Sequence, residues 1–426
     1  MTQLAQADAD AKRPVPDYDG RGNVDAHPTR RWSWIPRVVL FPAYVVEEYA
    51  LRRPLGWIIS TAERDQWLDT AVDTFSFGPQ HNYLLIPTVS YEFGFRPNAG
   101  LYFSGDNVLL IDNSVRAEVS TAGSHYLNAT LLDRYAVTDK TTISTRFDVN
   151  RRSDMMFFGI GPDVTDATRA RWGVQQIDMH TSLKQQRFGE SWISLSAGAR
   201  SVEYRPPDCC SNDPSIGDAV TRGYFPLPPG YAVPYTVMYE HADMQLDSRP
   251  PKPAPGTGVY LRLHERGDFE LNGQRGWVEY GGALGGAFDV TGHQRVLRLI
   301  GALDFVDPIA GETPFNELAS LGSEMMPGFV TGWMRGRSTI AGQLAYTWPV
   351  GSWVDGVARV SVGNAFGERL EGFSIAKLRA SGDLGITTNE LRDQGVELVF
   401  GLGTETFEQG AGITSVRIAF GTRGGF

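Results

Sequence analysis

The stretch Ile143-Ser144-Thr145-Arg146-Phe147-Asp148-Val149-Asn150 decides the fold. Ile, Thr, Phe and Val stand at every second position, and Ser, Arg, Asp and Asn stand between them. A period of two is typical of a β-strand with one apolar and one polar face. Because the polar face carries an arginine and an aspartate, the stretch predicts a strand that separates an apolar surface from a wet one.

The same alternation recurs on both sides of this stretch. Runs with a period of two lie at 89–96, 177–184, 193–200 and 259–264, and charged residues recur on their polar faces. A water-filled lumen opposite a lipid-facing surface explains this pattern. About 345 residues, at roughly 20–22 residues per strand and turn, predict an all-β fold: a transmembrane antiparallel β-barrel of about 16 strands.

Composition and charge exclude other classes. The chain has 426 residues and a net charge of −10 without a basic block, which makes it a poor nucleic-acid binder. No run of about 20 apolar residues predicts a membrane helix, because prolines and charges break the best candidate, 32–59. The 48 glycines and many aromatic residues suit a barrel and a soluble Gly-rich β protein equally. The alternation, not the composition, therefore favours the barrel.

Three regions follow from a walk along the chain. Residues 1–30 are polar, aperiodic and rich in Asp, Pro and Gly, which predicts a disordered tail. Residues 31–78 are rich in aromatic residues and divided by prolines, which predicts short periplasmic or interfacial helices. A helical plug or lid on the main domain is an equal alternative for that region. The barrel is expected to occupy 79–426.

The chain ends in a strand that is expected to close the barrel. It runs from about 413 to 426 and would pair with a first strand at about 87–96. One face of this strand carries four apolar residues: Val416, Ile418, Phe420 and Phe426. A terminal Phe on the outward face resembles the C-terminal signal that bacterial barrel-assembly machinery reads, although an ordinary edge strand can end in Phe by chance.

Three segments carry a family resemblance. They are FFGIGPD at 157–163, LDSR at 246–249, and PFNELASLG at 314–322 followed by MPGF at 326–329. Their order and spacing resemble the F-[FY]-G-[IL]-G, D-[ST]-R and PF-x-EL-x-x-LGG…LRGF patterns of the bacterial surface antigen (BamA/TamA) superfamily of outer-membrane barrels. The family's E-Y-R-x-P and F-x-D-x-G-N patterns fall on two later segments, 345–349 and 362–366.

The resemblance implies a loop that folds into the barrel and lies against its inner wall. The loop motif corresponds to Met326, Pro327, Gly328 and Phe329, and the wall positions facing it correspond to Ala345, Arg359, Ser361 and Gly363. The family's Arg, Asp and Glu are replaced by Pro327, Ser361 and Ala345. Losing both signs together avoids leaving a partly buried carboxylate unpaired, which costs several kcal/mol.

Two arginines follow the loop motif. Arg335 and Arg337 are candidates for a substitute charge; the favoured alternative is that they face lumen water or lipopolysaccharide. A second departure from the family is at the N-terminus, where no βααββ pattern predicts the periplasmic POTRA domains of well-known members. We therefore expect a compact member that lacks POTRA domains.

Enzymatic and cofactor motifs are not recognisable. The seven histidines lack zinc-site spacing, and no G-x-S-x-G elbow occurs. We expect no enzyme activity, no metal and no cofactor; a barrel hydrolase with Ser and His on its rim is a minor alternative. Cys209 and Cys210 lie in a Pro-rich loop, as an adjacent disulfide or as free thiols.

These observations lead to two functional hypotheses. The first is a Gram-negative outer-membrane barrel that, as the resemblance implies, assists insertion or translocation of other proteins through a lateral seam between the first and last strands. The second is a degenerate structural barrel, scaffold or passive pore for a partner protein. The expected partners are outer-membrane lipid, lipopolysaccharide, and unfolded barrel clients or a surface or periplasmic protein, with no nucleic acid.

Overall fold

The structure is a computed structural model. It describes residues 81–424 apart from 211, 250–255, 291–294, 351–353 and 389–393, together with 57, 61, 65, 70 and 73–78. The predicted tail at 1–30 and most of the predicted helical segment at 31–78 lie outside the described residues, as does Phe426.

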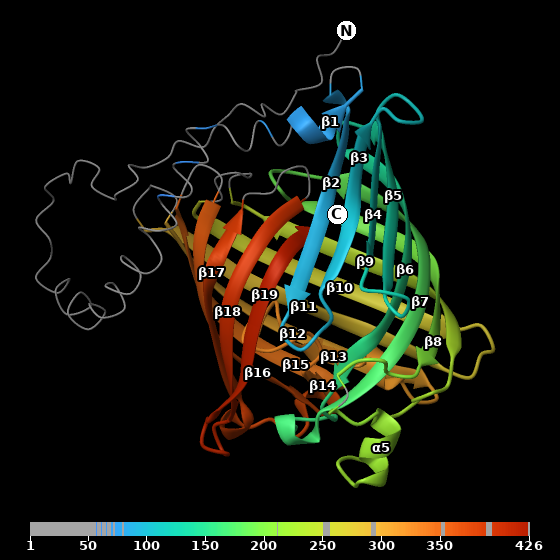
Figure 1. The fold of residues 1–426 in the computed structure, drawn as a ribbon, viewed down its shortest axis with the longest axis vertical. Helices are drawn as coiled ribbons and strands as arrows, with labels where there is room; N and C mark the ends of the chain where they lie inside the picture. Colours follow the sequence, from blue (N-terminus) through green and yellow to red (C-terminus); the bar gives the residue numbers. More distant parts are fainter. Residues whose placement is uncertain are drawn as a thin grey trace, which may run out of the picture.

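The main sheet closes on itself as an antiparallel barrel (Figure 1). Of its 17 strands, 16 form the wall, and β1 pairs only with the start of β2. Each wall strand pairs with its neighbours in order, and β19 returns to β2. The predicted 16-strand barrel is therefore confirmed.

The strands have the following bounds: β1 (Ser76–Phe77), β2 (Tyr83–Glu92), β3 (Asn98–Asp106), β4 (Asn113–Thr121), β5 (Leu127–Thr138), β6 (Thr141–Phe157), β7 (Ala170–Gln186), β8 (Trp192–Arg205), β9 (Tyr235–Asp247), β10 (Gly258–Glu270), β11 (Gly276–Asp289), β12 (Val296–Ala310), β13 (Ala319–Leu321), β14 (Met334–Gly336), β15 (Ser338–Pro349), β16 (Val354–Phe366), β17 (Arg379–Thr388), β18 (Gln394–Thr406) and β19 (Ile413–Gly424). Among the described residues, no helix is long and apolar enough to span a bilayer.

The apolar and polar residues that alternate in the sequence lie on the outer and inner faces of the wall, respectively. On β19, Val416 and Ile418 are 45% and 38% exposed on the outside, whereas Arg417 between them is 8% exposed and points inward. The inner face holds ion pairs within and between strands, such as Arg146 with Asp148 at 2.7 Å. An apolar outer surface and a charged lining are what a bilayer-spanning barrel requires.

The wall is uneven in height. Strands β2, β3 and β4 have 10, 9 and 9 residues, whereas β6 and β7 have 17 each. The first strand ends earlier than the predicted 87–96, because the chain turns after Glu92 and Gly94 takes a φ of +88° that suits glycine. This turn, residues 93–97, lies beside the inner wall.

An apolar cluster fills one end of the barrel. The short helix α5 (Ile216–Thr221) contributes Ile216 and Ala219 to it, and Phe157, Trp172 and Phe315 pack against them. Figure 1 shows α5 at the end of the barrel opposite to β1. Because Phe315 belongs to the connection between β12 and β15, the cluster packs that connection against α5.

Candidate functional site

The connection between β12 and β15 folds back into the barrel, and we call residues 311–337 the internal loop. It begins with a 3-10 turn, η5 (Phe315–Glu317), and its strands β13 and β14 pair antiparallel. Figure 1 shows this short hairpin near the end of the barrel where α5 lies. The predicted motif at 326–329 connects the two strands.

The tip of the internal loop is hydrogen-bonded to the inner wall. The amide of Gly328 donates to Ser381 Oγ at 2.6 Å, and Ser415 Oγ donates to the carbonyl of Gly328 at 2.7 Å. Gln343 Nε2 donates to the carbonyl of Glu324 at 3.0 Å. The tip is therefore attached to three separate strands, β15, β17 and β19.

These wall residues belong to one row across five strands. Cross-strand pairing joins Gln343, Ser361, Ser381, Gly403 and Ser415 in that order. All five residues are neutral and most are small, so the row offers hydrogen bonds and space rather than charge. We call it the serine row.

Glycines let the loop lie flat on β18. A Cβ on Gly328 would overlap the carbonyl of Leu402, and a Cβ on Gly403 would overlap the ring of Phe329. Phe329 is fully buried and packs against Trp333, with ring centroids 5.2 Å apart. The close approach therefore requires glycine on both surfaces.

The predicted inner-wall positions all point inward. Ala345 lies on β15, and Arg359, Ser361 and Gly363 lie on β16. Ser361 belongs to the serine row, and its buried Oγ has no hydrogen-bond partner among the described atoms. Arg359 is paired with β17: its Nε donates to both carboxylate oxygens of Asp383, at 2.9 and 3.0 Å.

The charge next to the loop tip lies on the wall. Arg417 Nη1 donates to the carbonyl of Pro327 at 3.4 Å, and its Nε donates to Glu92 Oε1 at 2.6 Å. In the family pattern the arginine belongs to the loop; here the loop offers a carbonyl and β19 supplies the guanidinium. Sequence reasoning placed Arg417 on the inward face but did not identify its partners.

The two arginines after the motif have other partners. Arg335 is buried, and its Nη1 lies 3.5 Å from the carbonyls of Phe315 and Asn316. Burial lowers the pKa of its guanidinium to about 10, so it remains charged at neutral pH. Arg337 donates to Asp307 and Glu368, each at 2.9 Å. Neither arginine bonds to the serine row.

The motif around Glu317 anchors the base of the internal loop. Arg200 Nη2 donates to Glu317 Oε2 at 2.7 Å and to Asp268 Oδ1 at 2.9 Å. Tyr204 Oη donates to Asn316 Oδ1 at 2.5 Å. Because Arg200 is 6% and Asp268 1% exposed, these bonds join the loop to strands β8 and β10 away from bulk water.

The FFGIGPD segment packs on the other side of the loop. Phe158 stacks on Trp333 with ring centroids 3.8 Å apart, and the amide of Gly161 donates to the carbonyl of Arg335 at 2.7 Å. Asn364 Nδ2 donates to the carbonyl of Pro162 at 3.0 Å. FFGIGPD and the internal loop, two of the segments that carry the family resemblance, thus meet, whereas LDSR lies at the far end of β9, where Asp247 bonds to Arg249.

The seam between β19 and β2 is short. Three residue pairs join the strands, Ala419–Glu92, Phe420–Tyr91 and Gly421–Ser90, and the amide of Phe93 donates to Ile418 O at 2.8 Å. By comparison, 11 pairs join β19 to β18 and eight join β2 to β3. The β19–β2 ladder is therefore the shortest between neighbouring wall strands in the described part of the barrel.

Beyond the seam, one edge of β2 is open. Strand β1 covers Tyr83 and Leu84, β19 begins to pair at Ser90, and no described residue pairs with 85–89 on this edge. The amide of Phe93 points to β19, so the alternation of a strand puts Pro87 on the same edge. Pro87 cannot donate a hydrogen bond, and prolines in sheets are confined to such edges.

The lumen beside the seam is polar. A cavity of about 750 Å³ is bounded by charged and polar side chains of β2–β11, among them Arg146, Asp178, His180, Arg266 and Glu279. Among the described residues, no group of three His, Cys, Asp or Glu side chains is placed to hold a metal ion. The lining is suited to water and polar chain segments.

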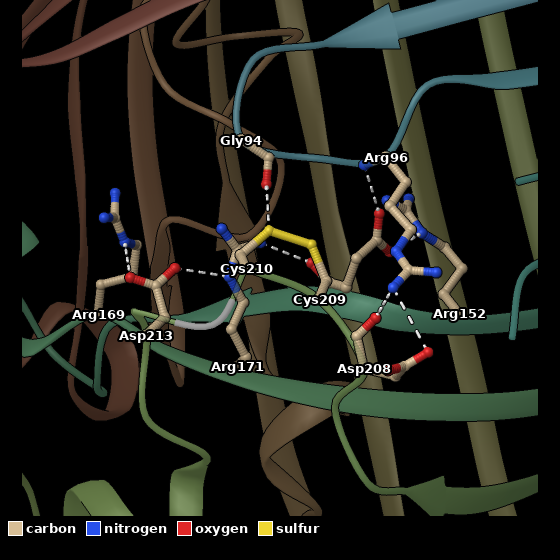
Figure 2. Close-up of a disulfide and its surroundings, with 10 residues drawn as sticks. Gly94, Arg96, Arg152, Arg169, Arg171, Asp208, Cys209, Cys210 and Asp213 are labelled. Carbon is tan, nitrogen blue, oxygen red and sulfur yellow. Dashed lines mark hydrogen bonds and ion pairs between the residues drawn. A yellow bond between two sulfur atoms is a disulfide. The ribbon is translucent and has the colours of Figure 1, made fainter.

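The two cysteines form a disulfide, which resolves the alternatives left by the sequence. Figure 2 shows Cys209 and Cys210 in the β8–β9 connection, beside the turn that follows β2. Cys210 Sγ lies 3.9 Å from the carbonyl of Gly94. The disulfide thus lies next to a strand of the seam.

Known structures share this architecture. The truncated BamA from Haemophilus ducreyi lacking POTRA domains 1–3 matches with a TM-score of 0.57 at 13% identity, over 80% of this chain and 70% of that chain. CdiB from Acinetobacter baumannii matches with a TM-score of 0.50 at 11% identity, over 80% of this chain and 59% of that chain. At these identities the likeness shows the fold. No family model and no curated protein sequence matches the chain.

Sequence reasoning missed the residues that hold the loop tip. Ser381, Gly403, Ser415 and Arg417 come from β17, β18 and β19, and each is inconspicuous in its own strand. The signal that identifies them is their shared row, which becomes visible only after the strand register is known. Short hydrogen bonds to Ser381 and Ser415 stand where the family pattern has a charge pair.

Proposed function

We propose that this protein is an outer-membrane barrel of a Gram-negative bacterium that assists the assembly or export of outer-membrane or surface proteins through its seam. The observation that carries the proposal is the short β19–β2 ladder beside the open edge of β2 at 85–89. Unpaired backbone groups in lipid are costly, so such an edge favours pairing with an incoming strand. The fold shared with BamA and the sequence resemblance support the same kind of function.

The two sides of the seam are held unequally. On the β19 side, Ser415 and Arg417 bond to the tip of the internal loop. On the β2 side, Glu92 is joined to this assembly through Arg417. Opening the seam would therefore break the Arg417–Glu92 pair while the loop keeps β19 in place, and a client strand would add to the open edge of β2.

The second candidate is a structural barrel or passive pore for a partner protein. The observation that favours it is the loss of the family's opposite charges between the loop tip and the wall, where Pro327 and Ser361 replace them. A polar lumen of about 750 Å³ also fits a pore. In this function the seam would stay closed.

Photo-crosslinking in cells distinguishes the two functions. A benzophenone amino acid at Val89 lies on the open edge of β2, and the matched control at Leu195 is equally outward-facing on β8. We expect Val89, but not Leu195, to capture strands of other barrel or surface proteins. Equal capture at both positions, or none at Val89, would contradict a client-binding seam.

Depletion of the protein followed by quantitative outer-membrane proteomics then shows which membrane proteins depend on it. Broad loss of barrel proteins indicates an assembly factor, and loss of one or two surface proteins indicates a dedicated translocator. An unchanged proteome together with negative crosslinking supports the structural barrel.

A further inference from the structure

The β8–β9 connection reaches the turn that follows the seam strand. In Figure 2 Asp208 and Cys210 lie below Gly94 and Arg96, which belong to this turn. Arg96 Nη2 donates to the carbonyl of Asp208 and lies 3.4 Å from its carboxylate, and Cys210 Sγ lies 3.9 Å from Gly94 O. These contacts begin one residue after Phe93, whose amide makes the last hydrogen bond of the seam.

The segment that makes these contacts is itself anchored to the wall. The carboxylate of Asp213 accepts from Arg169 Nε at 3.0 Å and from Arg171 Nε at 2.8 Å (Figure 2). The amide of Asp213 donates to the carbonyl of Cys210 at 2.9 Å, and the amide of Asp208 donates to Ser153 O at 3.0 Å. The contacts to the turn thus connect the seam strand to β6 and β7.

The disulfide determines the conformation between these anchors. Cys210 has a φ of +59°, in the left-handed region that residues with a side chain rarely adopt. The bond to Cys209 holds it there, with its sulfur toward Gly94. Once the bond is broken, Cys210 is free to return to a common conformation; its sulfur then moves away from Gly94, and the peptide after Asp208 can turn its carbonyl away from Arg96 while the Asp208 amide stays bound to Ser153.

We propose that the Cys209–Cys210 segment is a redox-sensitive latch that holds the end of the seam strand β2 in the closed barrel. The inference rests on the proposed function in that it concerns the same seam, and it adds a means of regulating it. A dithiol reductant opens the latch: the disulfide gains two electrons and two protons to become two thiols, and the dithiol is oxidised to its cyclic disulfide.

A second attachment limits what reduction does. The amide of Arg96 donates to Asp154 Oδ2 at 3.1 Å, and Asp154 is held by Arg152 Nε at 2.9 Å. This attachment does not involve the cysteines. Reduction should therefore loosen the seam end of β2 without detaching the turn or unfolding the barrel.

Hydrogen–deuterium exchange of the folded, full-length barrel in detergent tests the latch. We compare the oxidised protein with protein treated with dithiothreitol, after mass spectrometry confirms both free thiols. We expect amides in 90–96 to exchange on the order of tenfold faster after reduction, because the hydrogen bond from Arg96 to the Asp208 carbonyl weakens there. Amides in 141–151, where β6 pairs with both neighbours, should be unchanged.

A double variant supplies the matched control. Cys209→Ser with Cys210→Ser should exchange fast in 90–96 with or without dithiothreitol, so any effect of the reductant on this variant would overturn the inference. Unchanged exchange in 90–96 of the fully reduced wild type would overturn it as well. So would a uniform rise across the barrel, because that outcome is general destabilisation.

Hydrogen–deuterium exchange tests the latch independently of the proposed function, which crosslinking tests. Exchange is measured on the barrel alone, without a client, so a loosened seam combined with negative crosslinking at Val89 retains the latch and rejects insertion. Positive crosslinking combined with redox-insensitive exchange retains insertion and rejects the latch.

Discussion

Replacing Gly403 by alanine should release the internal loop from the wall. A Cβ at this position would lie 2.5 Å from Cζ of Phe329, and two more ring atoms would lie within 2.7 Å. Phe329 is fully buried, so its ring has little room to yield. The loop tip must therefore move away from β18 or remain there under strain.

The size of the effect follows from this overlap. Adding a methyl group to a well-packed site costs about 1–3 kcal/mol. Since each 1.4 kcal/mol changes an equilibrium about tenfold, the undocked loop should become about 5- to 150-fold more populated. The same change at Gly382 is the matched control: its Cβ would lie 3.5 Å from the nearest atom, the carbonyl of Arg359, in ordinary contact.

A spin label reports the release. Glu324 lies at the exposed part of the loop tip, and the two native cysteines are disulfide-bonded, so Glu324→Cys gives one reactive thiol among the described residues. We expect a mobile spectral component in Gly403→Ala but not in Gly382→Ala. Adding Phe329→Leu to Gly403→Ala should relieve the overlap, so the double variant should be less perturbed than the sum of the single variants.

The result that would refute the reasoning is a spectrum of Gly403→Ala that matches the control. It would mean that β18 and the loop adjust to a methyl group without separating. The close packing of glycine against the ring would then not be what positions the tip.

Three further outcomes are expected. Arg417→Gln removes the ion pair across the seam, so amides in 90–93 should exchange faster than in wild type. Pro327→Arg alone adds a cation beside the guanidinium of Arg417 and should raise protease sensitivity of the loop, whereas Pro327→Arg with Ser361→Asp supplies the partner and should lower it; unchanged sensitivity of the double variant contradicts this. Arg200→Gln leaves the buried carboxylate of Glu317 without its cation, at about 3–5 kcal/mol, and should lower the temperature at which the barrel loses its gel mobility.

The barrel itself was predictable because alternation is a local property. The apolar positions of β19, Val416, Ile418 and Phe420, are the outward positions, and Arg417 is inward as its place in the pattern indicates. The pattern places the first strand at about 87–96, a few residues later than β2 (Tyr83–Glu92), because the alternation continues through Phe93 while the backbone turns there. Only the left-handed glycine that follows marks the turn.

The contacts of the candidate site were not predictable in the same way. The order of the motifs indicated an internal loop and its inner wall, but hydrogen bonding of Gly328 to Ser381 and Ser415 depends on the register of three strands that are distant in sequence. A serine in an alternating strand carries no local sign of such a role. The loss of the family's charges is visible in the sequence, whereas the serines that hold the loop tip in their place become visible only in the assembled wall.

The unequal strand lengths have a consequence for the surrounding membrane. With a rise of about 3.3 Å per residue and a tilt of about 45°, strands of 9–10 residues span about 22 Å, and strands of 17 residues span about 40 Å. The hydrocarbon layer of a bilayer is about 30 Å thick. Beside β2–β4 this mismatch compresses the lipid leaflets or tilts the barrel. Where the leaflets are compressed beside β2–β4, a polypeptide that enters there crosses a thinner hydrocarbon barrier than it would beside β6 and β7.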